Sequence, residues 1–144
     1  ISEGDVTETL NGLKTLGGNL DFPARGRIIV SSIQPITNGS GAVTDQKIRW
    51  QRCTGALNMT SSYGVQGAAL GVAGIGPTGR KIATAANTEL IFVEVAYNYK
   101  ALIASSLIGT QTLRAIVAMN VRERSSNDLT NSGAASSCST FSAT

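Results

Sequence analysis

The chain has 144 residues, a formal net charge of +3 and no histidine, and charged residues make up only 15% of it. This length favours a single domain that needs no metal to fold. The weak and scattered positive charge argues against nucleic-acid binding. The sequence contains no run of the roughly 18 apolar residues that a helix needs to cross a bilayer. The lack of histidine excludes the common histidine general base and the catalytic triads built on it. We therefore expect no catalytic, cofactor or metal site. The low share of charged residues is typical of the surfaces of secreted and filament-forming proteins.

The first predicted element is an amphipathic helix near the start of the chain. Its apolar residues recur at spacings of three and four: Val6, Leu10, Leu13 and Leu16 form the stripe, and Leu20 is a further candidate member. Gly17 and Gly18 end the pattern, and either Ser2 with Asp5 or Asp5 with Glu8 can cap its start. A helix of about three turns is marginal in water, so the stripe must pack on the rest of the protein or meet a partner.

The first 21 residues hold four acidic side chains against one lysine, whereas the remainder of the chain is basic. This asymmetry predicts that the acidic segment lies on a basic sheet or meets a basic partner.

A β-hairpin is predicted next. Arg27–Ile36 is rich in β-branched residues and ends near Pro35, and Thr44–Cys53 alternates between apolar and polar positions. The turn sequence NGSGA at 38–42 joins the two runs. Trp50, the only tryptophan, lies in the second strand, and we expect it to be largely buried.

The segment 54–88 differs from its surroundings, because it contains seven glycines and many small residues. A single long helix is improbable there, although Val65–Val72 fits one or two helical turns. The sequence GIGPTGRK at 74–81 indicates an exposed loop. It lacks the GxxxxGK[ST] pattern and the strand and helix of a phosphate-binding loop, so it does not predict nucleotide binding.

Two strongly predicted strands follow, at Glu89–Lys100 and Thr112–Glu123. Both alternate apolar and other residues with a period of two, and we expect them to form the centre of the sheet. In the first strand, the face that begins with Ile91 is entirely apolar or aromatic and is expected to face the core. The opposite face carries Glu94 and is expected to be only partly covered. Glu94 is predicted to pair with Arg114 or Arg122 on a neighbouring strand.

The connection 101–109 is short and apolar, which fits either a helical turn under the sheet or a corner placed against a partner. The tail 125–144 is polar and would be disordered without an anchor. The two cysteines, Cys53 and Cys138, have no second pair at metal-ligand spacing. In an exported protein they would form a disulfide that pins this tail, and otherwise they are two unrelated free thiols.

The order of these segments is similar to that of a known family. The sequences EVAYNYKAL at 94–102 and LRAIVAMNVRER at 113–124 resemble segments of TadE-like proteins, the minor pilins or pseudopilins of bacterial tight adherence (Flp, type IVc) pili. The resemblance to the family's soluble domain covers most of residues 1–124. The family's prepilin cleavage site and hydrophobic N-terminal helix have no counterpart here, which indicates a processed or shortened chain, and Ala101 stands where the family has proline.

This resemblance implies a pilin-like α+β fold, with an N-terminal helix packed on a four-stranded antiparallel sheet. We expect a single domain made of a helix remnant at 1–20, a sheet domain at 25–124 and a polar tail at 125–144 that a disulfide pins.

The expected function is structural and not enzymatic. A minor pilin would help to prime or assemble an adhesive pilus through contacts with other pilin subunits and the assembly machinery. It would act at the periplasmic or extracellular face, anchored in the inner membrane by a preceding helix or incorporated in the pilus. The stripe Val6, Leu10, Leu13 and Leu16 and the loops at 54–88 and 101–109 are the predicted contact surfaces. A secreted adhesin or glycan-binding module and a viral coat or spike subunit are the alternatives.

Overall fold

The computed structural model describes residues 2–16, 20–100, 109–122, 128–130 and 134–143. These residues form two helices, α1 (Glu3–Leu16) and the single turn α2 (Phe22–Arg25), and four strands, β1 (Gly26–Thr37), β2 (Val43–Thr54), β3 (Thr88–Tyr99) and β4 (Gln111–Arg122). The predicted α+β class is confirmed, and each strand begins and ends within one residue of its predicted bounds.

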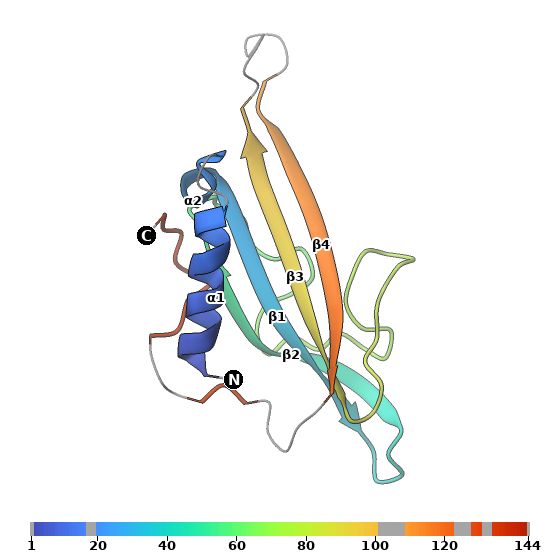
Figure 1. The fold of residues 1–144 in the computed structure, drawn as a ribbon. Coiled ribbons are helices and arrows are strands. Elements are labelled where there is room, and N and C mark those ends of the chain that lie inside the picture. Colours follow the sequence, from blue (N-terminus) through green and yellow to red (C-terminus); the bar gives the residue numbers. More distant parts are fainter. Residues whose placement is uncertain (1, 17–19, 101–108, 123–127, 131–133, 144) are drawn as a thin grey trace.

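The strands form one open antiparallel sheet in the order β2-β1-β3-β4. β1 and β3 are therefore the inner strands, and the prediction that the strand near 112–123 is central was wrong. Its alternating apolar sequence indicates a strand but does not say how many neighbours the strand has. In Figure 1, β4 forms one border of the sheet and α1 lies beside the other half.

Helix α1 begins with a reciprocal cap. The backbone N–H of Asp5 donates to the Ser2 hydroxyl oxygen over 3.1 Å, and the Ser2 N–H donates to the Asp5 carboxylate over 2.8 Å. This is the first of the two predicted caps. The hydrogen bond from the Ser2 backbone holds the pKa of Asp5 below its ordinary value. The helix ends at Leu16, so Leu20, which is exposed, does not continue the stripe.

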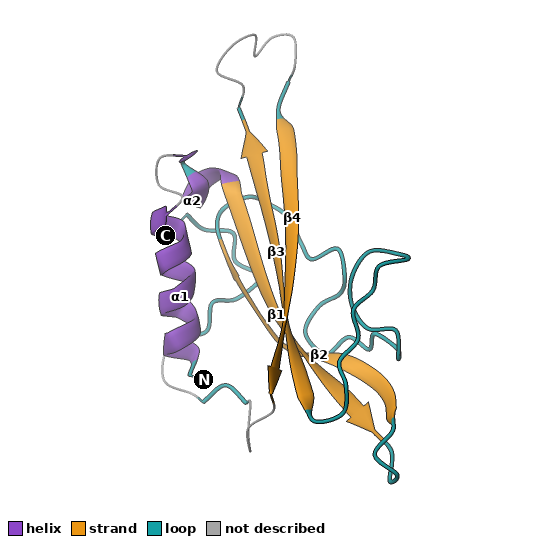
Figure 2. Cartoon of the chain, turned by 45° about the vertical axis from the view of Figure 1, so that its right-hand side comes forward, coloured by secondary structure: helices purple, strands orange, loops and turns teal. Residues whose placement is uncertain are grey.

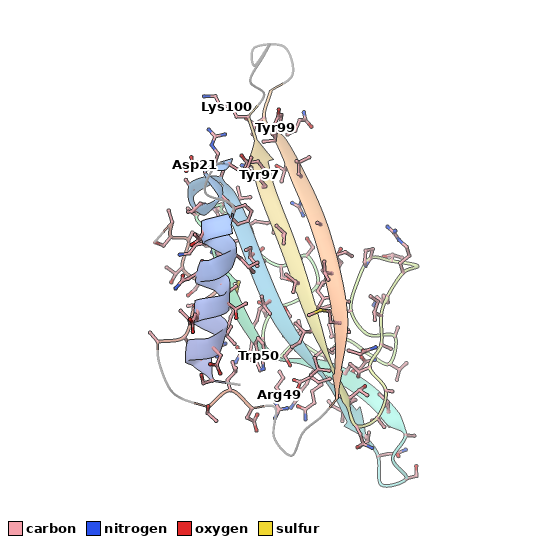
Figure 3. The ribbon with its side chains drawn as sticks, in the orientation of Figure 1. Asp21, Arg49, Trp50, Tyr97, Tyr99 and Lys100 are labelled. Carbon is pink, nitrogen blue, oxygen red and sulfur yellow. A yellow bond between two sulfur atoms is a disulfide. The ribbon has the colours of Figure 1, made fainter. Side chains whose placement is uncertain are left out.

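One hydrophobic core lies between α1 and the sheet. Its buried members come from both helices and from β1 and β2, and they are Val6, Leu10, Phe22, Ile28 and Trp50. Trp50 is only 6% exposed, as predicted, and Figure 3 shows it between α1 and the sheet. At the far end of this layer, Tyr97 stacks on Phe22 with ring centroids 6.0 Å apart and donates to the carbonyl of Leu20.

Residues 55–87 cover the opposite face of the sheet and enclose a second core. Its buried members are Ile33, Ile48, Ile75, Leu90 and Phe92. The side chain of Gln46 fastens this segment, because it donates to the carbonyl of Val72 over 2.8 Å and accepts from the backbone N–H of Thr84 over 2.8 Å. The predicted helical turns at 65–72 are absent from the described structure, which has turns and the single bridge Lys47↔Ala69 there. Backbone pairing with the edge of β2 replaces helical hydrogen bonding.

Glu94 does not pair with Arg114 as predicted. Its buried carboxylate accepts hydrogen bonds from the Ser61 hydroxyl and from the Ser62 backbone N–H, the latter over 3.1 Å. Arg114 donates to the Ser62 hydroxyl over 3.2 Å. The side chain of Arg122, the other predicted partner, lies outside what the structure describes. The glycine-rich segment 55–87, which contains Ser61 and Ser62, therefore supplies the polar partners that a buried carboxylate requires.

The tail is held against one end of the sheet by a disulfide between Cys53 and Cys138, whose Cα atoms are 4.7 Å apart. Arg27, which is 1% exposed, adds a polar anchor. Its guanidinium donates to the carbonyls of Gly55, Cys138 and Thr140 over 2.7–2.8 Å. Burial lowers the pKa of Arg27 from its ordinary value, but a guanidinium remains charged in proteins.

A partly buried ion pair joins the start of α1 to the sheet. The carboxylate of Glu3 accepts from the guanidinium of Arg52 on β2, as the acidic N-terminal segment predicted. The hydrogen bond from Arg52 is the main cause that lowers the pKa of Glu3 from its ordinary value of 4.5.

We expect Glu3→Gln to remove part of the dependence of stability on pH. The folded-state pKa of Glu3 lies below the unfolded value, so the contribution of this pair is present above the unfolded pKa and is lost as pH falls through the folded pKa. At pH 7 the substitution should lower the free energy of unfolding by about 1–3 kcal/mol. Urea unfolding of wild type and variant at pH 7 and pH 3 measures the difference in pH dependence, because the other carboxylates contribute equally to the stability of both proteins. An equal fall in stability for wild type and variant would contradict the assignment.

Candidate interaction surface

The helix-side face of the sheet is only half covered. α1 lies over the β1 and β2 half, and in Figure 2 none of the described helices lies over β3 and β4 on that side. The residues of β3 on this face, Ile91, Val93 and Val95, are half-buried. On β4, Leu113, Val117 and Met119 are 56%, 53% and 56% exposed. These six apolar side chains are called the open strip below.

The strand register makes the open strip continuous. Ile91 lies opposite Met119, Val93 opposite Val117, and Tyr97 opposite Leu113. Directly opposed side chains on one face of an antiparallel pair are in contact range. The strip is therefore a connected apolar surface and not a set of isolated exposed residues.

The two faces of β3 reverse the prediction from the sequence. The face with Leu90, Phe92, Glu94 and Ala96 is fully buried, whereas the entirely apolar face that begins with Ile91 is only half-buried. The glycine-rich segment covers the first face, and α1 is too narrow to reach across the second. An apolar face that remains partly open in the folded chain is a candidate contact surface.

A groove of about 320 Å³ runs between α1 and the open strip. Its walls include Val6 and Leu10 from the helix and Val30, Trp50 and Ile91 from the sheet. The indole N–H of Trp50 is buried, and within the described structure it has no hydrogen-bond partner. The groove extends the apolar surface from β4 to the flank of the helix.

The two edges of the sheet also differ. The edge of β2 is covered by the chain's own backbone: Ile48 exchanges hydrogen bonds of 2.8–3.0 Å with Gly67 and Ala68, and the Cys53 N–H donates to the carbonyl of Ser136 over 3.0 Å. In the part of the chain that the structure describes, β4 pairs with β3 and with no other segment. β4 is thus both an apolar surface and an open edge.

The predicted contact residues of the helix are used inside the protein. Val6 and Leu10 are buried in the helix-side core, where they also line the groove, while Leu13 is exposed. The side chain of Leu16 and the connection 101–108 lie outside the described residues. Sequence reasoning missed β4 as a contact surface. One usable signal was that β4 comes last in chain order among the four described strands.

The described residues do not assemble a metal centre. No three His, Cys, Asp or Glu side chains among them group closely enough to hold a metal ion. Of the described helices, none combines the length and apolar character that a membrane crossing requires. No protein-family model, curated protein or solved structure matches the chain. Its function is therefore inferred from the open strip and the edge of β4.

Proposed function

We propose that the protein is a structural subunit of an extracellular assembly, a minor pilin or pseudopilin of a tight adherence pilus, which acts through protein contacts and not catalysis. The open strip is the observation that carries this proposal. Three side chains of β4, Leu113, Val117 and Met119, are more than half exposed on one face. Contiguous apolar surface of this kind typically marks a site of protein association.

Two further features support an exported pilus subunit. A short N-terminal helix packs on a four-stranded antiparallel sheet, which is the arrangement that the resemblance to TadE-like pilins implies. The Cys53–Cys138 disulfide suits an oxidising compartment such as the periplasm. The partners would be other pilin subunits and the pilus assembly machinery, and the site of action would be the periplasmic or extracellular face.

The proposal is tested in the bacterium that encodes the protein. Deletion of the gene is expected to reduce the number of pili seen by electron microscopy and to reduce surface attachment. Wild type and Val72→Lys should restore both, because Val72 is exposed on the glycine-rich segment, outside the open strip. Met119→Lys should fail to restore them, because it places a charge in the strip.

Two outcomes would contradict the proposal. Normal pili and normal attachment after deletion, or full rescue by a Met119→Lys protein present at the wild-type level, would rule out a role for the strip in pilus assembly.

A further inference from the structure

β4 has few of the features that keep an edge strand from pairing. It spans 12 residues, and its pairing with β3 runs from Gln111 to Arg122 without a bulge. Its sequence, QTLRAIVAMNVR, contains no proline and no acidic residue, and its only charges are Arg114 and Arg122. Short length, proline, bulges and inward charges are the usual protections of an edge.

We propose that β4 pairs antiparallel with β4 of a second copy of this chain, about a two-fold axis at Val117. The two four-stranded sheets would then join into one continuous sheet. This inference names a partner for the edge of β4, the strand that carries half of the open strip, and so rests on the contact surface proposed above, although it does not require a pilus. An isologous contact of this kind uses the same residues on both copies.

The sequence of β4 is self-complementary in this register. A two-fold axis perpendicular to the sheet keeps each side chain on its own face, so odd positions meet odd positions and even positions meet even ones. The pairs are Val117 with Val117, Ala115 with Met119, Leu113 with Val121, Ile116 with Ala118, and Arg114 with Asn120. Apolar residues meet apolar residues throughout, and each arginine faces a neutral polar residue, since Arg122 meets Thr112.

Charge selects this register over a close alternative. Moving the axis to Ala118 would bring Arg114 directly opposite Arg122, and moving it to Arg114 would oppose that residue to itself. Like charges directly opposite each other destabilise strand pairs. Centring the pairing on Val117 avoids both contacts and uses eleven residues of each strand, from Thr112 to Arg122.

The size of the contact indicates a reversible dimer. Eleven paired residues span about 37 Å, and a sheet is about 10 Å thick, so the contact covers roughly 370 Å² of each copy. A stable dimer typically buries about 800 Å² per partner. We therefore expect a dissociation constant on the order of 10–100 µM, which high local concentration in an assembly would offset.

Sedimentation equilibrium of the purified chain up to about 500 µM tests the pairing, since this concentration exceeds the expected dissociation constant. Val117→Lys places two ammonium groups side by side at the axis and should raise the dissociation constant at least about tenfold. Val72→Lys adds the same charge at a residue that is 60% exposed, away from β4, and should leave the constant unchanged. Both residues are exposed, so neither change should unfold the chain.

Cysteine substitution tests the register itself. Val117→Cys should cross-link with itself under mild oxidation, because opposed Cα atoms are about 4.5–5.5 Å apart, within the range of a disulfide. Ala115→Cys alone should not, because two copies of that residue would be about 14 Å apart. A mixture of Ala115→Cys and Met119→Cys proteins should give the mixed dimer.

Three results would overturn the pairing: a chain that stays monomeric, a dimer that Val117→Lys does not weaken, or equal cross-linking of Ala115→Cys and Val117→Cys. Binding of a different pilus subunit at β4 by a chain that remains monomeric would also replace the second copy as partner. The two proposals fail separately. A dimer in solution without any effect of gene deletion on pili would count against the pilus, and a monomer that still restores pili would count against the pairing.

Discussion

Loss of the Cys53–Cys138 disulfide is expected to lower the melting temperature by about 10–20 °C. The bridge joins residues 85 positions apart, and in the chain-entropy model a loop of that size stabilises the folded state by about 4.5 kcal/mol. Each kcal/mol corresponds to about 2–4 °C for a chain of this size. The double variant Cys53→Ala, Cys138→Ala, followed by circular dichroism against temperature, measures the effect.

A reducing agent provides the control for this prediction. It should lower the melting temperature of the wild type to about that of the double variant and leave the double variant unchanged. If wild type and variant melt together under oxidising conditions, the bridge does not carry the expected share of the stability.

Arg27→Met is expected to cost about 3 kcal/mol of unfolding free energy and to release the tail. The guanidinium donates to the carbonyls of Gly55, Cys138 and Thr140, and the ring of Phe141 lies 4.4 Å from its central carbon. Methionine fills much of the same volume but leaves these carbonyls without their donor, which costs about 1–3 kcal/mol for each one that stays buried. Urea unfolding and limited proteolysis of the tail measure the two effects.

Arg25→Met is the matched control for Arg27. Arg25 forms a partly exposed ion pair of 3.5 Å with Asp21, and such pairs contribute about 0–1 kcal/mol. Equal destabilisation by the two substitutions would show that burial of Arg27 does not matter. Because Arg27 and the disulfide hold the same tail, their combined loss should cost less than the sum of the single losses.

Local features of the fold could be predicted from the sequence. The cap formed by Ser2 and Asp5 depends on neighbouring residues only. The strand bounds follow from alternation with a period of two, and burial of Trp50 follows from the size of its apolar ring. The cap and the strand bounds depend on residues within one turn or one strand, so the sequence pattern states them directly.

Features that depend on neighbours far apart in the chain could not be predicted in this way. Arg114 lies on the neighbouring strand, diagonal to Glu94, yet the Ser61–Ser62 segment reaches the Glu94 carboxylate instead. Residues 65–72 have a composition that permits a helical turn, but the free backbone edge of β2 binds them instead. Both outcomes depend on how the glycine-rich segment folds back over the sheet, which no local pattern encodes.

The open strip shows the same difference between what a local sequence pattern predicts and what the folded chain decides. The alternation of Ile91, Val93 and Val95 and of Leu113, Val117 and Met119 shows from the sequence that each set lies on one face of its own strand, and the strand register places both sets on the same face of the sheet. Whether that face is covered depends on the width of α1 and on the strand order, which leaves β4 at the edge. Periodicity records the direction of a side chain relative to its own backbone, whereas exposure depends on what packs above it, and that is settled only when the whole chain has folded.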